Sequence, residues 1–300
     1  MMSYGLFSGA ALNSYAIQSL GALVVPAGIQ PIEKQIAMIR EFGVDTIAAT
    51  PSYYLCIYNY LIENNIDPKS LGLKVGIAAG EAYGNELKQK ISELFGIRIF
   101  DHYGLCEVNT GIVYECAKCG GMAVLKDYVY AEVVDPDTGA PLPNGEYGEL
   151  VLSSTMKDAS PILRYRTGDC AALIERSSGC DTCKGSTVLS RIRHRIDDTF
   201  FYKGLLINPY ELRDFIILQS GDRRIDNIKI EVHEDVDGIV HKIQVKLALV
   251  VPVSNEQFLA IMERKLYDQT RVHISVEQVP DSYFEKKSLK IKLVEHVAQE

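Results

Sequence analysis

Apolar residues in the first hundred positions follow two different spacings. Between residues 31 and 42 they recur every three or four positions, which predicts a helix. The same pattern predicts helices over 52–63 and 85–95, the first with Ser52 as its N-cap. Short apolar runs that end at turn residues predict strands over 22–26, 46–50, 73–79 and 97–100. Strands separated by helices of this length indicate βαβ units and a mostly parallel sheet.

From about residue 120 the pattern changes to short strands separated by strong turn signals. The turns are D-P-D-T-G at 135–139 and P-N-G at 143–145. This spacing predicts a β-rich subdomain, with strands over 129–134, 148–153, 162–165 and 171–174.

A third region begins near Asp197, where helical and strand patterns alternate again. Helices are predicted over 208–219 and 255–266. The strands of this region are predicted over 228–233, 241–251 and 272–278. About a hundred residues of this kind suit a small α+β domain with its own core. We therefore expect an α/β protein with a domain over 1–196 and a second domain over 197–300.

Composition and charge narrow the class of partner. The 300 residues carry 39 acidic and 31 basic side chains, a formal net charge of −8, which argues against nucleic acid or an anionic membrane as a partner. No apolar run reaches the roughly 18 residues that a membrane span needs. The first residues lack the basic and apolar regions of a signal peptide. We expect a cytoplasmic protein.

Two motifs follow predicted strands in the first region. In G-I-A-A-G-E at 76–81, Gly80 lets a planar group approach the backbone next to Glu81, although a helix-opening turn explains the same residues. In D-H-Y-G-L-C-E at 101–107, Tyr103 can stack on a base and the carboxylate of Glu107 can hold Mg²⁺ beside a phosphate. The alternative for the second motif is a loop with a capping Asp and a surface Glu.

Two further motifs lie between residues 164 and 212. In R-Y-R-T-G-D at 164–169, Asp169 follows a turn and can accept hydrogen bonds from two ribose hydroxyls, or can simply cap a loop. The segment R-I-D-D at 195–198 is followed by Lys203-Gly204 and N-P-Y-E-L. Its Asp197 falls where the pattern changes, which favours either a hinge or a solvated linker.

The order and spacing of these four motifs resemble those of the adenylate-forming superfamily of acyl-CoA ligases. Three segments narrow the resemblance to one branch of this superfamily. They are T-P-S-Y at 50–53, V-D-P-D-T-G at 134–139, and R-I-D-D running on to I-N-P at 207–209. These segments look like phenylacetate-CoA ligases and their coenzyme F390 synthetase-like relatives. The resemblance implies a partial large AMP-binding domain, made of a mostly parallel sheet plus a β-rich subdomain, followed by a mobile C-terminal α+β domain.

The resemblance also implies a reaction and a set of site residues. An aryl or acyl carboxylic acid would react with ATP to give an acyl-adenylate. The acyl group would then pass to coenzyme A. Asp169 would bind the ribose hydroxyls, Arg195 the ribose or a phosphate, and Asp197 would be the hinge. Glu107 would help hold Mg²⁺, and Gly204 would lie beside the pantetheine arm. The pocket for the adenine ring of ATP or AMP would contain Gly80, Glu81, Tyr103 and Gly104.

The catalytic lysine of the family lies near the C-terminus, and Lys287 aligns with it, with Lys290 in the place of an arginine. Lys286 stands where the family has Gly, and His194 replaces the usual Gly before Arg195. The alternative for Lys287 is a solvated basic strand face.

Four of the seven cysteines form two C-x-x-C pairs. These are Cys116 with Cys119 and Cys180 with Cys183, each followed closely by Gly. Four thiolates at this spacing favour structural Zn²⁺ in a reducing compartment, which would tie together two loops about 60 residues apart. Two reduced pairs without metal and an iron–sulfur cluster are the alternatives. A run of tyrosines at 53, 54, 58 and 60 either lines an acyl pocket or packs as a helix face.

The resemblance places a Ser/Thr/Gly-rich phosphate loop upstream of the first strand, and we find no such loop here. We therefore expect an enzyme completed by a separate N-terminal subunit, with a homodimer as the habit of the family. The alternative is a truncated or degenerate homologue that binds nucleotide or a partner chain without ligation.

Overall fold

The computed structural model describes residue 4 and residues 8–174, 180–183, 186–221, 224–250, 256–284 and 292–298. Within it the chain divides into two compact units. The first unit comprises residues 1–82 and 91–196, and the second comprises residues 83–90 and 197–300. No helix in the described part is both long and apolar enough to cross a membrane.

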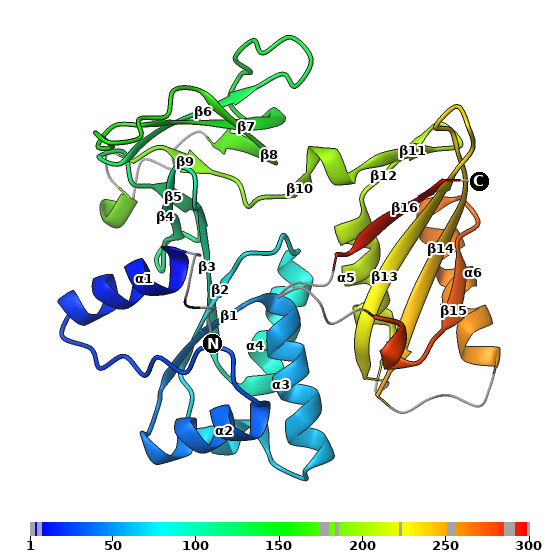
Figure 1. The fold of residues 1–300 in the computed structure, drawn as a ribbon, viewed down its shortest axis with the longest axis horizontal. Helices are drawn as coiled ribbons and strands as arrows, with labels where there is room; N and C mark the ends of the chain where they lie inside the picture. The colour runs from blue at the N-terminus through cyan, green and yellow to red at the C-terminus, as the bar shows by residue number, and fades with distance from the viewer. Residues whose placement is uncertain are drawn as a thin grey trace. The chain divides into compact units, whose positions relative to one another are not determined.

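The first unit begins its sheet with three parallel strands. They pair in the order β1 (Thr46–Ala49), β2 (Val75–Ala79) and β3 (Arg98–Leu105). The helix α2 (Ile32–Glu41) precedes β1, α3 (Pro51–Glu63) lies between β1 and β2, and α4 (Asn85–Phe95) lies between β2 and β3. Figure 1 shows α2 and α3 beside these strands, in blue. β2 and β3 each have a predicted motif at the carboxyl end, which is where ligands bind in open α/β sheets.

The N-terminus of α3 differs from the sequence prediction. Thr50, not Ser52, is the N-cap, because the Thr50 side chain accepts a hydrogen bond from the backbone N–H of Tyr53. Pro51 occupies the first helical turn, where its missing N–H costs nothing. The Ser52 hydroxyl instead donates to Glu81, as described below.

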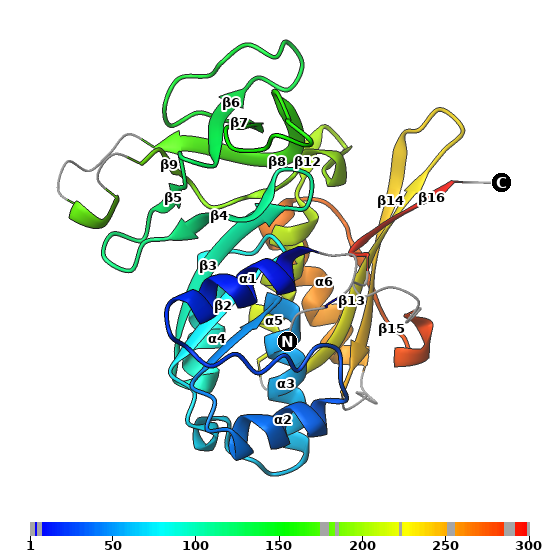
Figure 2. The same cartoon turned by 60° about the vertical axis from the view of Figure 1, so that its left-hand side comes forward.

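The sheet of the first unit continues with antiparallel strands to a total of ten in the described residues. The strand order is β1-β2-β3-β4-β5-β9-β8-β7-β6, and β10 pairs with β8. The added strands are β4 (Asn109–Glu115), β5 (Met122–Val124), β6 (Val129–Val134), β7 (Tyr147–Ser154), β8 (Tyr165–Ile174), β9 (Val188–Leu189) and β10 (His194–Arg195). Figure 2 shows β3 and β4 leading from the parallel strands toward β6–β8. Their shared core contains Ile112, Leu150, Leu152 and Leu189.

The second unit has its own core. A four-stranded mixed sheet runs in the order β15 (Ser275–Gln278), β14 (Val240–Leu249), β13 (Ile225–Glu234) and β16 (Val294–Ala298). On β13 the buried apolar residues Ile228, Ile230 and Val232 alternate along the strand, so one face of the sheet is apolar. The remaining elements are the hairpin β11 (Phe200–Tyr202) and β12 (Leu205–Ile207), and the helices α5 (Pro209–Gln219) and α6 (Glu256–Thr270).

Several predicted elements differ from the structure. Residues 22–26 form no strand; Leu23 is 85% exposed and cannot supply the buried face that the apolar run suggested. The helix α1 (Ser8–Ser19) was not predicted. The strand predicted over 162–165 is wrong except at its last residue, because β8 begins at Tyr165; β8 then runs on through the strand predicted over 171–174. The predicted α/β class, with a large sheet and a separate small sheet domain, is confirmed.

Candidate functional site

Three residues from the second, third and fourth motifs meet in the first unit. The Tyr103 hydroxyl donates to Asp169 Oδ2 at 2.6 Å. Arg195 Nη1 lies 3.4 Å from Asp169 Oδ1 and 3.3 Å from the carbonyl oxygen of Thr167. These contacts bring together β3, β8 and β10, which are distant in the sequence. The arrangement gathers a carboxylate, a cation and an aromatic ring at one place.

The position of Asp169 results from a local irregularity in β8. Gly168 has a φ of +74°, and the pairing of β7 with β8 shifts register at this point. A backbone in the left-handed region favours Gly, which explains the residue before the carboxylate. The Thr167 hydroxyl donates to the carbonyl oxygen of Leu150 and accepts from the backbone N–H of Asp169. Asp169 therefore lies within a strand, not after the turn that the sequence predicted.

The electrostatics of the three residues favour a neutral phenol beside a carboxylate. Burial, and then the charge of Asp169, raise the pKa of Tyr103 well above its ordinary value. The phenol therefore keeps its proton at neutral pH and serves as a donor. Asp169 is only 6% exposed, and its contacts with Tyr103 and Arg195 stabilise the buried carboxylate.

A second ion pair, between an exposed arginine and a buried glutamate, lies close to Asp169 in the sequence. Arg166 pairs with the carboxylate of Glu149, whose other oxygen accepts from the backbone N–H of Gly168 at 3.1 Å. Glu149 is 5% exposed. Sequence reasoning missed Glu149, although an acidic residue within the apolar run of β7 is a signal for a buried charge.

Glu81 has a definite structural role in the first unit. Its Oε1 accepts from the Ser52 hydroxyl at 2.6 Å, and its Oε2 accepts from the Ser52 backbone N–H at 3.2 Å. The carboxylate thereby caps the N-terminus of α3, where negative charge is favourable. Gly80, with a φ of +83°, turns the chain at the end of β2 so that Glu81 can reach this helix.

The remaining residues of the second motif lie on the β3–β4 hairpin. The strand β3 continues through Leu105, five residues beyond the strand predicted over 97–100, so residues 101–105 are strand and not the alternative of a loop. A Cβ added at Gly104 would lie 2.5 Å from the backbone nitrogen of Gly111, so this glycine allows the two strands to approach. Glu107 is exposed in the turn that follows, and its carbonyl oxygen accepts from Lys157 Nζ at 2.6 Å.

Other predicted site residues belong to the second unit. Asp197 lies in a short 3₁₀ turn (Ile196–Asp198) and is the first residue of its second segment. Gly204 lies in the β11–β12 turn with a φ of +80°, and an added Cβ would meet nothing within 4 Å. Within this chain its backbone conformation, and not crowding, therefore requires glycine. Lys287 and Lys290 lie outside the described residues.

Two tyrosines of α3, Tyr54 and Tyr58, contact the same aromatic ring. Tyr54 is fully buried, packs edge-on against Phe95 and donates to the carbonyl oxygen of Ile47. Tyr58 contacts the same phenylalanine ring. These two residues pack as a helix face, which leaves no acyl-pocket role for Tyr54.

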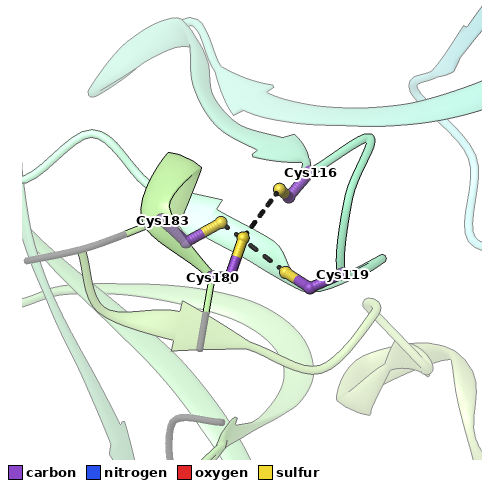
Figure 3. Close-up of side chains that lie close together, drawn as sticks. All are labelled: Cys116, Cys119, Cys180 and Cys183. Carbon is purple, nitrogen blue, oxygen red and sulfur yellow. Dashed lines mark hydrogen bonds between the residues drawn. The ribbon is translucent and has the colours of Figure 1, made fainter. Parts of the chain in front are cut away.

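The two C-x-x-C pairs form one cluster, shown in Figure 3. The four sulfur atoms lie within 4.8 Å of one another. The Sγ–Sγ distances are 3.6 Å between Cys116 and Cys180, and 3.7 Å between Cys119 and Cys183. Thiolates at about 2.3 Å from a tetrahedral Zn²⁺ are separated by about 3.8 Å. The sulfur positions therefore fit a four-coordinate zinc ion.

The elements around the cluster explain how distant residues meet. Cys116 follows β4, and the backbone N–H of Gly120 donates to its carbonyl oxygen at 2.8 Å, which closes the first knuckle. Cys183 ends a short 3₁₀ turn (Asp181–Cys183) that precedes β9, and β9 pairs with β5. Burial opposes ionisation of Cys116, but neighbouring N–H donors outweigh it and lower the pKa of this thiol to about 6.

The cysteines outside the cluster differ in burial. Cys106 is exposed, Cys56 is half-buried and Cys170 is buried. Burial raises the pKa of Cys170, which suits a packing role for this residue.

Comparison with known proteins gives the class of the molecule. The family model described as AMP-binding enzyme matches residues 7–156. Phenylacetate-coenzyme A ligase from Pseudomonas putida is 35% identical over 216 residues, which are 71% of this chain and 48% of the relative. The enzyme of the same name from Aromatoleum evansii is 34% identical over 248 residues, 82% of this chain and 54% of the relative. The chain belongs to the AMP-binding enzyme family.

Solved structures of related ligases share this fold. One is 2-hydroxyisobutyryl-CoA ligase in complex with 2-HIB-AMP, with a TM-score of 0.85 and 20% identity over 99% of this chain and 64% of that one. Another is the anthranilate CoA ligase AuaEII with anthranoyl-AMP, with a TM-score of 0.63 and 16% identity over 90% of this chain and 52% of the other. The resemblance inferred from the motifs is confirmed. The chain spans about half the length of the curated relatives it matches.

Proposed function

We propose that this chain performs the nucleotide- and thiol-handling chemistry of an acid–thiol ligase of the phenylacetate-CoA ligase type. In the first step a carboxylate oxygen attacks the α-phosphorus of ATP and pyrophosphate leaves. In the second step the coenzyme A thiol loses its proton, its sulfur attacks the acyl carbon, and AMP leaves. The observation that carries the proposal is the meeting of Tyr103, Asp169 and Arg195, supported by similarity to phenylacetate-CoA ligases.

The nucleoside part of the proposal rests on Asp169. Its two carboxylate oxygens can accept from the two ribose hydroxyls, the geometry that suits an acidic residue in a nucleotide pocket. Arg195 already lies on one of these oxygens and can turn toward a phosphate. The Tyr103 ring offers a surface for the adenine, and Gly80, Glu81 and Gly104 complete that pocket in the proposal.

The next part of the proposal concerns the groups that interact with the phosphates of ATP. Glu107 is an exposed residue in the β3–β4 turn. Its carboxylate is a ligand of the kind that binds Mg²⁺ together with phosphate oxygens of the substrate. A bound Mg²⁺ supplies charge neutralisation at the phosphates. Lys287 places a cation on the α-phosphate of the adenylyl group that is transferred, which favours the transition state without covalent chemistry by the protein. Asp197 acts as the hinge between the two steps, and Gly204 borders the pantetheine arm.

The cysteine cluster is proposed to hold a structural zinc ion. Cys116, Cys119, Cys180 and Cys183 would fill all four positions, so the site is closed to substrate. The ion would add stability by joining the β4–β5 turn to the segment between β8 and β9. It takes no part in the reaction.

The experiment that tests the proposed function begins with binding, since the chain spans about half the length of its relatives. AMP and Mg·ATP are titrated by calorimetry, and acid-dependent pyrophosphate release is then followed with phenylacetate, other aryl acids and coenzyme A. Lys287→Ala is compared with Lys286→Ala. We expect nucleotide binding by all three proteins, and a loss of release of roughly a hundredfold or more only in Lys287→Ala.

Two results would change the conclusion. Absence of AMP and ATP binding would overturn the nucleotide site itself. Binding without acid-dependent release, also after addition of the half of the Pseudomonas putida ligase that this chain does not match, would identify a nucleotide-binding homologue that does not ligate.

A further inference from the structure

The side chain of Arg191 lies between two carboxylates of the β3–β4 pair. Its Nη2 is 2.8 Å from Glu115 Oε2, and its Nη1 is 3.4 Å from Asp101 Oδ2. The backbone N–H of Asp101 also donates to Glu115 Oε2, at 2.8 Å. The side chains of Arg191, Asp101 and Glu115 are 16%, 13% and 10% exposed. We call these three residues the Arg191 clamp.

Charges as little exposed as these need partners in fixed positions. A guanidinium group presents donors in a rigid plane and can hold two carboxylates at once, which an ammonium group cannot do with the same geometry. Removal of the arginine would leave two neighbouring carboxylates without this cation, a costly arrangement. The contact with Glu115 is a directional hydrogen bond and the contact with Asp101 is an ion pair, so a lysine can replace the arginine only in part.

The Arg191 clamp joins the two segments that carry Tyr103 and Arg195, the residues that contact Asp169. Arg191 lies between β9 and β10, four residues before Arg195. Asp101 lies on β3, two residues before Tyr103. Arg195 and Tyr103 are the residues that meet at Asp169, so Arg191 links the backbones that carry them.

The β10 strand needs such an anchor because its own pairing is short. Only two residue pairs connect it to β8, His194 with Cys170 and Arg195 with Asp169. The backbone N–H of Arg193 adds one hydrogen bond to the carbonyl oxygen of Cys170, at 2.9 Å. A two-residue strand is only weakly held by its own hydrogen bonds.

We propose that Arg191 is a positioning residue for the nucleotide site. By holding Asp101 and Glu115, it keeps Arg195 in register with Asp169 and keeps that pair facing Tyr103. It touches no substrate itself. The inference rests on the proposed function for its effect on nucleotide affinity, whereas its effect on β10 can be measured without any ligand.

The test uses Arg191→Met, Arg191→Lys and a control that weakens the same unit elsewhere. Leu61→Ala removes a fully buried side chain of α3 and lowers stability without touching the clamp. Hydrogen exchange of the peptide covering 191–196 is compared with that of β6. AMP dissociation constants are measured for all proteins well below their melting temperatures.

We expect Arg191→Met to speed exchange in 191–196 but not in β6, and to weaken AMP binding roughly tenfold to a hundredfold. Arg191→Lys should lie between Arg191→Met and the wild type, and Leu61→Ala should keep wild-type AMP affinity. Unchanged exchange in Arg191→Met would overturn the clamp, whatever the ligand result. Faster exchange with unchanged AMP affinity, or an equal loss of affinity in Leu61→Ala, would overturn its positioning role. Failure of the wild type to bind AMP would overturn the proposed function, and exchange alone would then decide whether the clamp holds β10.

Discussion

The hydroxyl of Tyr103 donates to Oδ2 of Asp169 at 2.6 Å, although 66 residues separate them in the sequence. The carboxylate proposed for the ribose is therefore already oriented by a neutral donor before any nucleotide arrives. Arg195 approaches the other carboxylate oxygen at 3.4 Å. A site organised in this way loses less entropy on binding than one that must first assemble.

Asp169→Asn tests the carboxylate with almost no change of shape. The amide oxygen can still accept from Tyr103, but the charge and one acceptor are lost. Because hydrogen bonds to charged groups contribute about 1.5–3 kcal/mol, AMP affinity should fall roughly tenfold to a hundredfold. Calorimetry with AMP measures the change, and circular dichroism of the same samples checks folding. Wild-type affinity in this variant would exclude Asp169 from the nucleotide site.

Tyr103→Phe tests the raised pKa of the phenol through the pH dependence of stability. Burial and the charge of Asp169 keep Tyr103 protonated in the folded state to a higher pH than in the unfolded state. The unfolded chain, with a tyrosine pKa of about 10, therefore releases its proton first as pH rises. The stability contributed by Tyr103 is fully present below that pH and is lost as pH increases above it.

Urea unfolding between about pH 8 and pH 11 measures this effect. The wild type should be more stable than Tyr103→Phe at the lower pH, and the difference should shrink above about pH 10. The other tyrosines ionise in both proteins and cancel in the comparison. A difference that stays constant with pH would contradict the buried, protonated phenol.

Cys183→Ser tests the zinc ion. We expect the wild type to carry one zinc per chain, and the variant to lose the metal because a hydroxyl is a poor zinc ligand. The melting temperature should fall by at least about 5 °C. Cys106→Ser, at an exposed cysteine outside the cluster, serves as the control and should keep both metal and stability. Metal analysis that finds no zinc in freshly purified wild type would contradict this prediction.

Gly204→Ala separates backbone strain from a role in the thioester step. An alanine at this positive φ costs about 1–2 kcal/mol of stability. Gly238 has a similar φ, and an added Cβ would also meet nothing within 4 Å, so Gly238→Ala is a matched control. Both variants should lose similar stability and keep acid-dependent pyrophosphate release. Only Gly204→Ala should lose thioester formation; equal thioester rates in the two variants would remove Gly204 from the pantetheine path.

Elements with strong local signals were predicted to the residue. The helix α4 spans Asn85–Phe95 and the strand β6 spans Val129–Val134, both as predicted. The predicted start of α3 was wrong because Thr50 and Ser52 are both good N-cap residues. A local signal does favour Thr50, since Pro51 is preferred at the first helical position. The contact of Ser52 with Glu81, 29 residues away, depends on the tertiary structure.

The sequence by itself determined the periodic elements, the order of the four motifs and the spacing of the cysteine pairs. Those signals are local, since they depend on residues within a few positions of one another along the chain. Only the tertiary structure decided that Tyr103 and Arg195 meet at Asp169 and that Arg191 joins two carboxylates. The physical reason is that such contacts depend on strand order and register, and on a bulge at Gly168, which side chains distant in sequence settle together when the core forms.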